Sequence, residues 1–345
     1  MSGAHALDGS RTYDVVVIGG GVAGLSGALT LARARRSVLV IDSGEARNAP
    51  SAGVHNYLGR EGTPPGELDG IGREEVARYG GRIVPGAVTA ATRDDDGLFA
   101  VTTADGGSVR ARRLLVTTGV VDELPDVAGL AELWGRSVLH CPYCHGWEVR
   151  DRAVGIVATD IGMAMHQALL WRQWTDDLVL FQHTAQEPTA EQRAQLDARG
   201  IRLVVGEVAG VEAADGAGVI DGDEADGGRH LTGVRLASGE VVERHAVAVA
   251  TTLHARADFL GTLGLEPAEL RFDDVVIGEA VPALNPMGAT AVPGVYVAGN
   301  VTNPMAQVIV SAAAGMMAGA VINGELATED TERAVATRAA GAVVR

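Results

Sequence analysis

Residues 13–42, YDVVVIGGGVAGLSGALTLARARRSVLVID, limit what this chain can fold into more than any other segment. A β-branched run over 15–18 enters a glycine-rich turn, and an amphipathic stretch follows. A second strand-like run over 38–41 then ends on Asp42. This order predicts a strand, a tight turn, a helix and a second strand, which together start a parallel sheet.

The turn carries a candidate nucleotide site. Gly19, Gly21 and Gly24 form G-x-G-x-x-G, and Asp42 lies 23 residues after Gly19. The glycines alone are a weak signal, but between a strand and a helix they let the backbone approach a pyrophosphate. The carboxylate at the end of the next strand then binds ribose hydroxyls. The alternative is a tight turn without a ligand.

The rest of the chain predicts an α/β fold with two Rossmann-like three-layer domains, the second inserted into the first. A second α/β pattern runs over about 137–250, and a third block ends in VYVAGNVTNPMAQVIVSAAAG. The acidic, glycine-rich stretch 213–230 is interpreted as a solvated loop. The predicted domains are 12–121 plus 252–325, and 122–251. Residues 1–11 and 326–345 are expected to be flexible tails, the latter a loose helix or disordered.

Composition excludes several function classes. The 345 residues carry a formal net charge of −16, which argues against binding nucleic acid or an anionic membrane. The N-terminal ten residues lack a basic, apolar secretory pattern. The longest apolar stretch, 308–322, is short for a membrane span and rich in small residues, so a buried helix is expected. We therefore expect a cytoplasmic protein that does not bind membranes.

The segment HCPYCHGWE, residues 140–148, contains both cysteines of the chain. A Cys-x-x-Cys motif lowers the thiolate pKa of one partner, more so at a helix start or beside histidine. Zinc would need four ligands. His140 adjoins Cys141 and His145 adjoins Cys144, a poor geometry for one tetrahedral ion. A structural disulfide is not favoured in a reducing compartment. The pattern indicates a redox-active Cys141–Cys144 pair and no metal site.

Several segments together identify a family. The chain resembles the low-molecular-weight thioredoxin reductases over about 13–325, through GGGVAG, HNYLG (55–59), LLVTTG (114–119), the Cys-x-x-Cys motif and VAGNVTNPMAQVIVSAAAG. The resemblance implies an FAD domain built from both ends of the chain, an inserted second domain and a homodimer. It also implies a disulfide stacked on the isoalloxazine ring.

By the same resemblance, further residues are expected at the flavin. The family usually carries aspartate where this chain has Asn300, whose amide can still hydrogen-bond a ribityl hydroxyl. The helix from about Gln307 would aim its N-terminal dipole at the pyrimidine end of the flavin. Besides the first glycine turn and Asp42, the predicted FAD contacts are Asn56, Tyr57, Thr118, Gly119, Gly299, Asn300, Gln307 and Val308.

The nucleotide turn of the second domain departs from the family. Thr159, Asp160 and Ile161 align with its three glycines. Residues 182–184, Gln-His-Thr, stand where a His-Arg-Arg triplet grips the 2′-phosphate. Ile161 would block a pyrophosphate and Asp160 would repel it, so NAD(P)H is not expected as a cofactor. A degenerate but working NADPH site is the alternative.

The residue after the second cysteine departs as well, because the reductases carry an acidic residue where His145 stands. CPYCHGWE is similar to the dithiol oxidases of natural-product pathways, the holomycin- and gliotoxin-type flavoenzymes. These close a disulfide in a small dithiol and pass the electrons to oxygen. A histidine of near-neutral pKa suits a general base for the incoming thiol. Alternatively, His145 only packs or caps.

Other side chains near the motif allow two interpretations. His55 and His140 either line the dithiol pocket or have structural roles. Glu148 either orients His145 or caps a helix. Trp171 and Trp174, at i,i+3 spacing, are interpreted as core or dimer surface.

The function predicted from the sequence is an FAD-dependent dithiol oxidase with Cys141, Cys144, His145 and His140 as catalytic residues. Electrons would pass from a small dithiol through Cys141 and Cys144 to FAD and then to O₂, giving H₂O₂. One rival is a disulfide reductase fed by NADPH or ferredoxin. The other is a redox-sensing protein that holds FAD as a structural ligand.

Overall fold

The computed structural model describes Leu7 and residues 11–216 and 228–343. Most of the leader 1–11 and of the loop 213–230 lies outside the described residues. The chain divides into two compact units. The first comprises Met1–Arg47, Gly66–Val121 and Leu253–Arg345, and the second comprises Asn48–Pro65 and Asp122–Thr252. The division after Val121 and near 252 follows the sequence expectation. Residues 48–65, expected in the FAD domain, instead group with the second unit.

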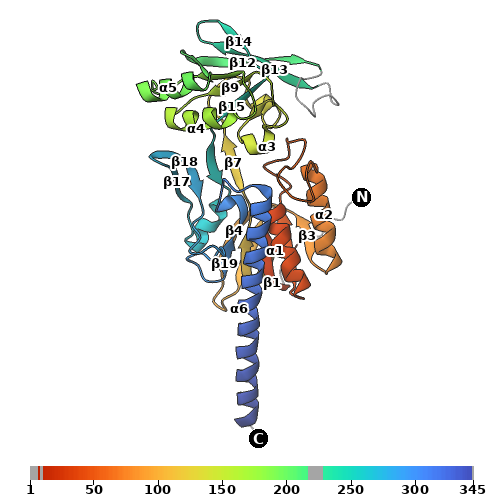
Figure 1. Ribbon diagram of the computed structural model, residues 1–345. Coiled ribbons are helices and arrows are strands. Elements are labelled where there is room, and N and C mark those ends of the chain that lie inside the picture. Colours follow the sequence, from red (N-terminus) through yellow and green to blue (C-terminus); the bar gives the residue numbers. More distant parts are fainter. Residues whose placement is uncertain (1–6, 8–10, 217–227, 344–345) are drawn as a thin grey trace. The chain divides into compact units, whose positions relative to one another are not determined.

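The first unit is built on a mixed seven-stranded sheet in the order β3-β2-β1-β6-β5-β4, with β19 also paired to β6 (Figure 1). The strands β1, β2, β3, β6 and β19 run parallel. A smaller sheet has the order β17-β18-β16-β7. The elements are β1 (Thr12–Ile18), α1 (Val22–Arg33), β2 (Val38–Asp42), α2 (Pro65–Arg78), β3 (Arg82–Pro85), β4 (Val88–Arg93), β5 (Phe99–Thr103), β6 (Ser108–Val116), β7 (Val120–Glu123), β16 (Thr252–Ala255), η3 (Asp258–Leu263), β17 (Ala268–Phe272), β18 (Val275–Ala280), β19 (Val295–Val297), η4 (Gly299–Val301) and α6 (Val308–Val343).

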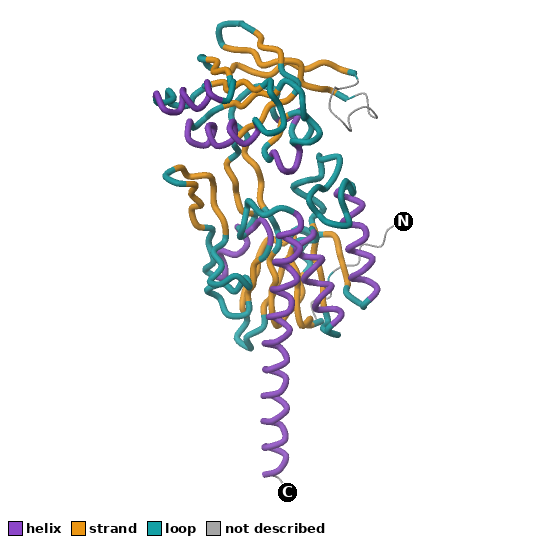
Figure 2. Tube along the Cα trace, viewed as in Figure 1, coloured by secondary structure: helices purple, strands orange, loops and turns teal. Residues whose placement is uncertain are grey.

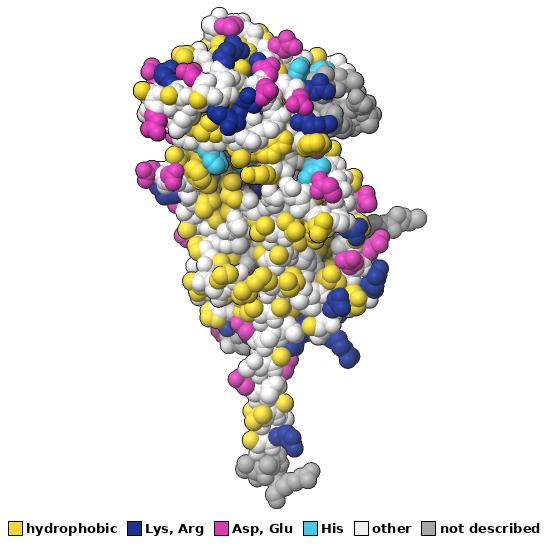
Figure 3. Space-filling model, in the orientation of Figure 1, with side chains coloured by type: hydrophobic (Ala, Val, Ile, Leu, Met, Phe, Trp, Pro, Cys, Tyr) yellow, Lys and Arg dark blue, Asp and Glu magenta, His cyan; other side chains and the backbone are white. Residues whose placement is uncertain are grey.

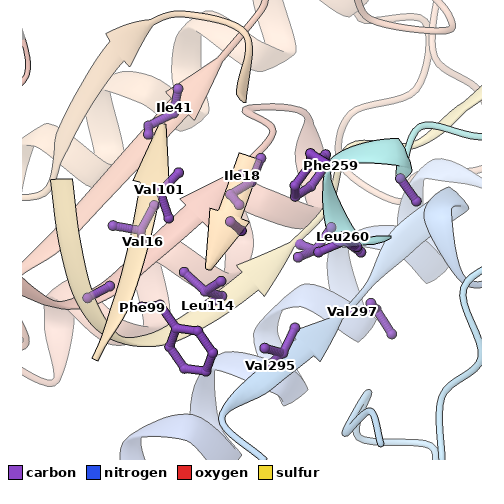
Figure 4. Close-up of a cluster of buried hydrophobic side chains, with 14 of the residues drawn as sticks. Val16, Ile18, Ile41, Phe99, Val101, Leu114, Phe259, Leu260, Val295 and Val297 are labelled. Atoms are coloured by element: carbon purple, nitrogen blue, oxygen red, sulfur yellow. The ribbon is translucent and has the colours of Figure 1, made fainter. Parts of the chain in front are cut away.

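Alternation along the central strands divides the core of this unit in two. Val16 and Ile18 of β1 point into one cluster, which contains Phe99 and Leu260 (Figure 4). Their neighbours Val15 and Val17 point to the other face of the sheet, where α1, α2 and α6 cover them. A strand buried on both faces is typical of a parallel sheet covered on both sides, so the uninterrupted apolar run predicts this arrangement.

The second unit repeats the layered plan. Its central sheet is parallel throughout, in the order β11-β10-β9-β15-β8. Helices α4 and α5 cover one face around the fully buried Trp171, and an antiparallel sheet β12-β13-β14 covers the other. The elements are η1 (Ala131–Leu133), β8 (Val138–Leu139), α3 (Pro142–His145), β9 (Val154–Val157), α4 (Ile161–Trp171), β10 (Leu178–Phe181), α5 (Ala190–Ala198), β11 (Arg202–Val204), β12 (Val208–Asp215), β13 (Arg229–Leu236), β14 (Val241–Glu243) and β15 (Ala246–Val249). Two three-layer α/β units, the second inserted into the first, confirm the predicted fold class.

Helices α1 and α6 pack with their backbones in contact. A Cβ atom on Gly315 would collide with the carbonyl group of Ala23. A Cβ atom on Gly319 would lie 2.8 Å from the carbonyl oxygen of Gly27. The small residues of 308–322 therefore serve helix–helix contact within the first unit. Helix α6 is also long and apolar enough to cross a membrane by length and composition alone, yet Ala318, Ile322 and Leu326 are fully buried, as in a core helix.

Of the two alternatives expected for 326–345, a loose helix or disorder, the described residues show a helix. Helix α6 continues unbroken to Val343 and runs well past the sheet (Figure 2). Asp330 anchors the extension by accepting from Arg36 at 2.6 Å and from Arg112 at 2.7 Å. Residues 331–340 are exposed, and Figure 3 shows hydrophobic and charged side chains mixed on this part of the helix. Favourable helix composition and the anchoring ion pairs sustain the extension without burial.

Helix α2 buries one carboxyl group, Asp69, behind the end of β2. The pKa of Asp69 is raised to about 6: burial is the largest cause, the positive charge of Arg73 opposes it, and the negative charge of Asp42 adds to it. Since the unfolded value is 3.8, the folded state binds the additional proton between about pH 4 and pH 6. The contribution of Asp69 to the free energy of unfolding is therefore most favourable below pH 4 and is lost as the pH rises to 6.

The packing of α1 on α6 predicts opposite effects of two alanine substitutions on the same helix. Gly315→Ala should lower the free energy of unfolding by about 2 kcal/mol, because the helices must move apart. Gly324→Ala is the control, since no atom lies within 4 Å of its added Cβ. It should leave stability unchanged or raise it by about 0.5 kcal/mol. Urea unfolding measures both, and equal effects would contradict the packing described.

The buried carboxyl group predicts a pH-dependent gain. Asp69→Asn should leave stability unchanged below pH 4 and raise the free energy of unfolding by about 2 kcal/mol above pH 6, because the amide needs no buried charge. Asp95→Asn, which removes an exposed carboxylate, is the matched control. Thermal unfolding of the FAD-saturated proteins from pH 4 to pH 8 tests this. A gain that is the same at every pH would refute the role given to Asp69.

Candidate functional site

The central parallel strands of the first unit end together at one edge of the sheet. Ile18 pairs with Ile41 and with Val116, and Val116 pairs with Val297. The glycine turn after β1, Asp42 at the end of β2, Thr118–Gly119 after β6 and Gly299–Asn300 after β19 therefore share this edge. In α/β folds ligands bind outside the carboxyl ends of such strands.

The first glycine turn has the shape that a pyrophosphate requires. Gly19 has φ +105°, and a Cβ there would lie 2.5 Å from the carbonyl oxygen of Thr117. A Cβ on Gly24 would collide with the carbonyl oxygen of Gly19, so α1 begins in direct contact with the turn. Gly21, the first residue before α1, has open space where its side chain would be. Gly19 thus allows the turn, Gly24 allows the helix to pack on it, and Gly21 allows a ligand to approach.

Asp42 is held in place by two partners that the sequence did not predict. Its Oδ1 accepts from the backbone N–H of Gly20 at 3.0 Å, and its Oδ2 accepts from Arg73 at 2.8 Å. Each carboxylate oxygen keeps a further acceptor position for a ribose hydroxyl. A Cβ on Gly20 would lie 2.5 Å from the carboxyl carbon of Asp42. The middle glycine of GGG could have indicated this contact, whereas no local pattern indicated Arg73.

The other two turns at this edge are also tightly built. The Thr118 hydroxyl donates to the carbonyl oxygen of Arg256 at 2.6 Å, and Gly119 faces open space. Gly299 has φ +74°, and a Cβ on it would lie 2.8 Å from the Cβ of Ala23 at the start of α1. The turn after β19 therefore packs directly on the helix that follows the first glycine turn.

Asn300 is an amide for a structural reason. Its Nδ2 donates to the carbonyl oxygens of Asn303 at 3.1 Å, Pro304 at 3.1 Å and Ala306 at 2.9 Å. This loop leads to Gln307 and Val308, where α6 begins. An aspartate would set a carboxylate against three carbonyl oxygens. The amide oxygen of Asn300 stays available to accept from a ribityl hydroxyl. The residues at this edge, taken together, fit FAD.

The cysteine pair lies on one short helical turn of the second unit. Cys141 precedes α3, and its carbonyl oxygen accepts from the N–H groups of Cys144 and His145, both at 3.2 Å. Residues three and four apart share a helix face, so Cys141, Cys144 and His145 lie on the same side. The two Sγ atoms are 2.7 Å apart, so the thiols can close to a disulfide with little movement. Among the described residues no three His, Cys, Asp or Glu side chains form a metal site.

His145 has a partner that the sequence did not predict. Its Nε2 lies 3.1 Å from the hydroxyl of Ser51, 94 positions earlier in the chain. Burial, and then repulsion from His55, lowers the pKa of His145 to about 4. The near-neutral pKa expected from the sequence is therefore wrong. The imidazole is neutral at physiological pH, so it can accept a proton but gives no standing positive charge to a thiolate.

The segment Asn48–Pro65, hereafter the docking segment, contacts α3 directly. The side-chain amide of Asn56 donates to the carbonyl oxygen of Tyr143 at 2.7 Å. The Nδ1 of His55 lies 2.7 Å from Glu61, and its Nε2 lies 3.4 Å from Glu148. Glu148 thus contacts His55, whereas Ser51 contacts His145. Asn56 remains a predicted flavin contact, and its observed partner belongs to the cysteine helix.

The remaining predicted side chains fall around this helix. His140 lies at the end of β8 with its Nδ1 3.4 Å from the carbonyl oxygen of Val249. Trp171 is core, as one interpretation held, and Trp174 packs edge-on against it. Trp174 also packs edge-on against Tyr143, with ring centroids 5.7 Å apart. A Cβ on Gly146 would lie 2.8 Å from the Trp174 ring, so the indole packs directly against the end of α3.

In the second unit, side chains occupy the backbone N–H groups of the turn that aligns with the family's nucleotide-binding glycines. Asp160 caps α4 by accepting from the N–H of Met163 at 3.0 Å, and Gln186 accepts from the N–H of Ile161 at 3.1 Å. These amide groups would otherwise be donors for a phosphate. Gln182 donates to the carbonyl oxygen of Ala185 at 3.3 Å, and His183 accepts from the N–H of Val208 at 3.1 Å. Burial lowers the pKa of His183, so this side chain offers no positive charge in place of the family's basic triplet.

Comparison with known proteins agrees with this construction. The family model described as pyridine nucleotide-disulphide oxidoreductase matches residues 13–315. Thioredoxin reductase tcpT of Claviceps purpurea is 31% identical over 84% of this chain and 87% of its own length. Thioredoxin reductase sirT of Leptosphaeria maculans is 29% identical over 90% and 93%. The crystal structure of HlmI is 41% identical, covers 97% of this chain and 98% of its own, and superposes with a TM-score of 0.83.

These matches confirm the family resemblance stated from the sequence, and membership implies an oxidoreductase that binds FAD. Family membership accounts for two features of the structure. These are the two glycine turns at one sheet edge and the cysteine pair in the inserted unit. The chain belongs to the pyridine nucleotide-disulphide oxidoreductase family, as a thioredoxin-reductase-like disulfide oxidoreductase.

Proposed function

We propose that this protein is an FAD-dependent dithiol oxidase that closes a disulfide within a small-molecule dithiol and delivers the electrons to O₂. One observation carries the proposal. A cysteine pair shares a helix face with a neutral histidine, in a unit whose nucleotide turn is closed by Asp160 and Gln186. The motif CPYCHGWE favours a natural-product dithiol as substrate.

The chain's own residues account for the thiol steps. His145 accepts the proton of the first substrate thiol, and the thiolate attacks Cys141 Sγ of the enzyme disulfide. The Cys141–Cys144 bond breaks, and Cys144 keeps the electron pair as a thiolate. The second substrate thiol then attacks the substrate sulfur of the mixed disulfide, so Cys141 is released and the substrate leaves as a cyclic disulfide. His140 remains a candidate for the second proton.

When bound, FAD would supply the two-electron acceptor that returns the cysteine pair to the disulfide and is reoxidised by O₂ to give H₂O₂. The cyclic disulfide and the enzyme disulfide are close in free energy, so an irreversible oxygen step gives the cycle its direction. The chain supplies binding at the first unit's sheet edge and the proton acceptor at the cysteine helix.

A reductase fed by NADPH or ferredoxin is the alternative, and the closed turn argues against its NADPH form. A phosphate at the start of α4 would have to displace both Asp160 and Gln186 from backbone N–H groups and then face the Asp160 carboxylate. As the family resemblance implies, we further propose a homodimer. We also propose that it works in the cytoplasm, as expected from the sequence.

Anaerobic flavin reduction separates the two functions. A small dithiol such as dithiothreitol should bleach the flavin band of the purified protein, and NADPH should leave it unchanged, because the amide donors of α4 are already occupied. Admitting air should restore the band and release about one H₂O₂ per flavin. Rapid bleaching by NADPH would overturn the oxidase proposal.

The cysteine roles predict the phenotype of one substitution. Cys141→Ser should lower turnover of a dithiol to below about a thousandth of the wild-type rate, because the attacked sulfur is missing. Dithionite, which reduces flavin directly, should still bleach the variant and show that its FAD is intact. Turnover close to that of the wild-type protein would exclude the proposed thiol exchange.

A further inference from the structure

Arg73 of α2 hydrogen-bonds the carboxylate that ends β2. Its Nη2 donates to Oδ2 of Asp42 at 2.8 Å, while the N–H of Gly20 donates to Oδ1 at 3.0 Å. A carboxylate with only one fixed oxygen can still turn about its Cβ–Cγ bond. Two donors on different oxygens fix its plane, so the acceptor positions that remain on each oxygen point in set directions.

The guanidinium of Arg73 does not take the partner that its own helix offers. Asp69 lies four residues before Arg73, the spacing at which an acid and a base pair along a helix. Arg73 acts on Asp69 through its charge, but its hydrogen bond goes to Asp42. The side chain therefore connects α2 to the end of β2, at the sheet edge that also carries the first glycine turn.

Apolar contacts hold α2 in place beside Arg73. Val76 is fully buried in the core that covers one face of the first unit's sheet. A Cβ on Gly72 would lie 2.9 Å from the Leu25 side chain, so α2 also packs closely on α1. The side chain of Arg73 is 40% exposed, and an ion pair this exposed adds little to the free energy of unfolding. Its use therefore lies with the ligand that binds at this edge.

A second carboxyl group makes the orientation of Asp42 depend more strongly on Arg73. Asp69 lies near enough for the positive charge of Arg73 and the negative charge of Asp42 to act on it. Arg73 is therefore one cation beside two carboxyl groups. Without it, repulsion between Asp42 and an ionised Asp69 would be unopposed, and it would turn the Asp42 carboxylate away from its present orientation.

We propose that Arg73 is a positioning residue for FAD: together with the Gly20 N–H, it orients the Asp42 carboxylate so that the remaining acceptor positions receive the hydroxyls of the adenosine ribose. Arg73 acts through Asp42 and needs no contact with the ligand. This role rests on the FAD binding that family membership implies, and it goes beyond the thiol chemistry proposed above. No bond is made or broken, so the expected effect is on FAD affinity.

Titration of the apoprotein with FAD tests this role at pH 8, above the pKa of about 6 to which burial raises the Asp69 carboxyl group. Arg73→Ala should raise the dissociation constant of FAD about tenfold, because a charged hydrogen bond that fixes the carboxylate is lost. The change in flavin fluorescence measures this constant. Arg78→Ala, which removes an exposed arginine of the same helix, is the matched control and should leave it unchanged. An unchanged constant in Arg73→Ala would overturn the proposal.

A modified ligand separates positioning from a general effect on the site. An FAD analogue built with 2′,3′-dideoxyadenosine lacks both ribose hydroxyls, so it should bind the wild-type protein more weakly than FAD does. Arg73→Ala should weaken binding of the analogue less than about twofold, because the hydroxyls that Asp42 would receive are absent. Equal losses for FAD and the analogue would mean that Arg73 acts on another part of the ligand or on folding, and the positioning role would be wrong.

A double-mutant cycle examines the same coupling from the protein side. In an Asp42→Asn background, Arg73→Ala should cost no further FAD affinity, because the carboxylate that it orients is gone. A further loss of about tenfold in the double variant would contradict the proposal. Unfolding midpoints of the apoproteins identify variants that do not fold, and Arg73→Gln replaces Arg73→Ala in that case. If dithiothreitol fails to reduce wild-type flavin, the oxidase function fails, whereas the FAD dissociation constants still decide the role of Arg73.

Discussion

Contact between the backbones of α1 and α6 joins the two ends of the chain into one nucleotide-binding unit. Gly315 lies against Ala23, and Gly299 of the turn after β19 lies against the same residue. Gly24 packs on Gly19, so both turns are in contact with the start of α1. The family resemblance implies that the first glycine turn and the Asn300 turn contact different parts of FAD, and the close approach of the two helices fixes the distance between these two turns. A side chain at any of these glycines would change that distance.

The two units show how the same α/β turn can be open or closed. In the first unit, Gly21 leaves open space before α1, and Asp42 is drawn to the turn by Gly20. In the second, Asp160 and Gln186 occupy the N–H groups at the start of α4. Helix N-termini need acceptors, and either a phosphate or a side chain can supply them. In the second unit, the side chains of Asp160 and Gln186 supply these acceptors.

The sequence predicted features that depend on local spacing. Short patterns predicted the glycine turns, the strands that flank them and the pair Cys141–Cys144, because each pattern has one physical interpretation. Contacts across long separations were missed, since neither Ser51 nor Arg73 stands in a pattern that indicates its partner. The docking segment was assigned to the wrong unit for the same reason. The pKa of His145 is lowered by burial and by neighbouring histidines, and neither can be predicted from the local sequence.

The neutrality of His145 has a consequence for the chemistry of the cysteine pair. A Cys-x-x-Cys beside a charged imidazolium would hold a stable thiolate and favour the reduced dithiol. Because burial keeps this imidazole neutral, the ring gives the thiolate no such stabilisation, and the disulfide is comparatively favoured. A cysteine pair whose disulfide is favoured has a lower reduction potential, so it is a weaker oxidant of another dithiol and, once reduced, a stronger electron donor. The neutrality of His145 therefore lowers the potential of the cysteine pair relative to a pair beside a charged imidazolium.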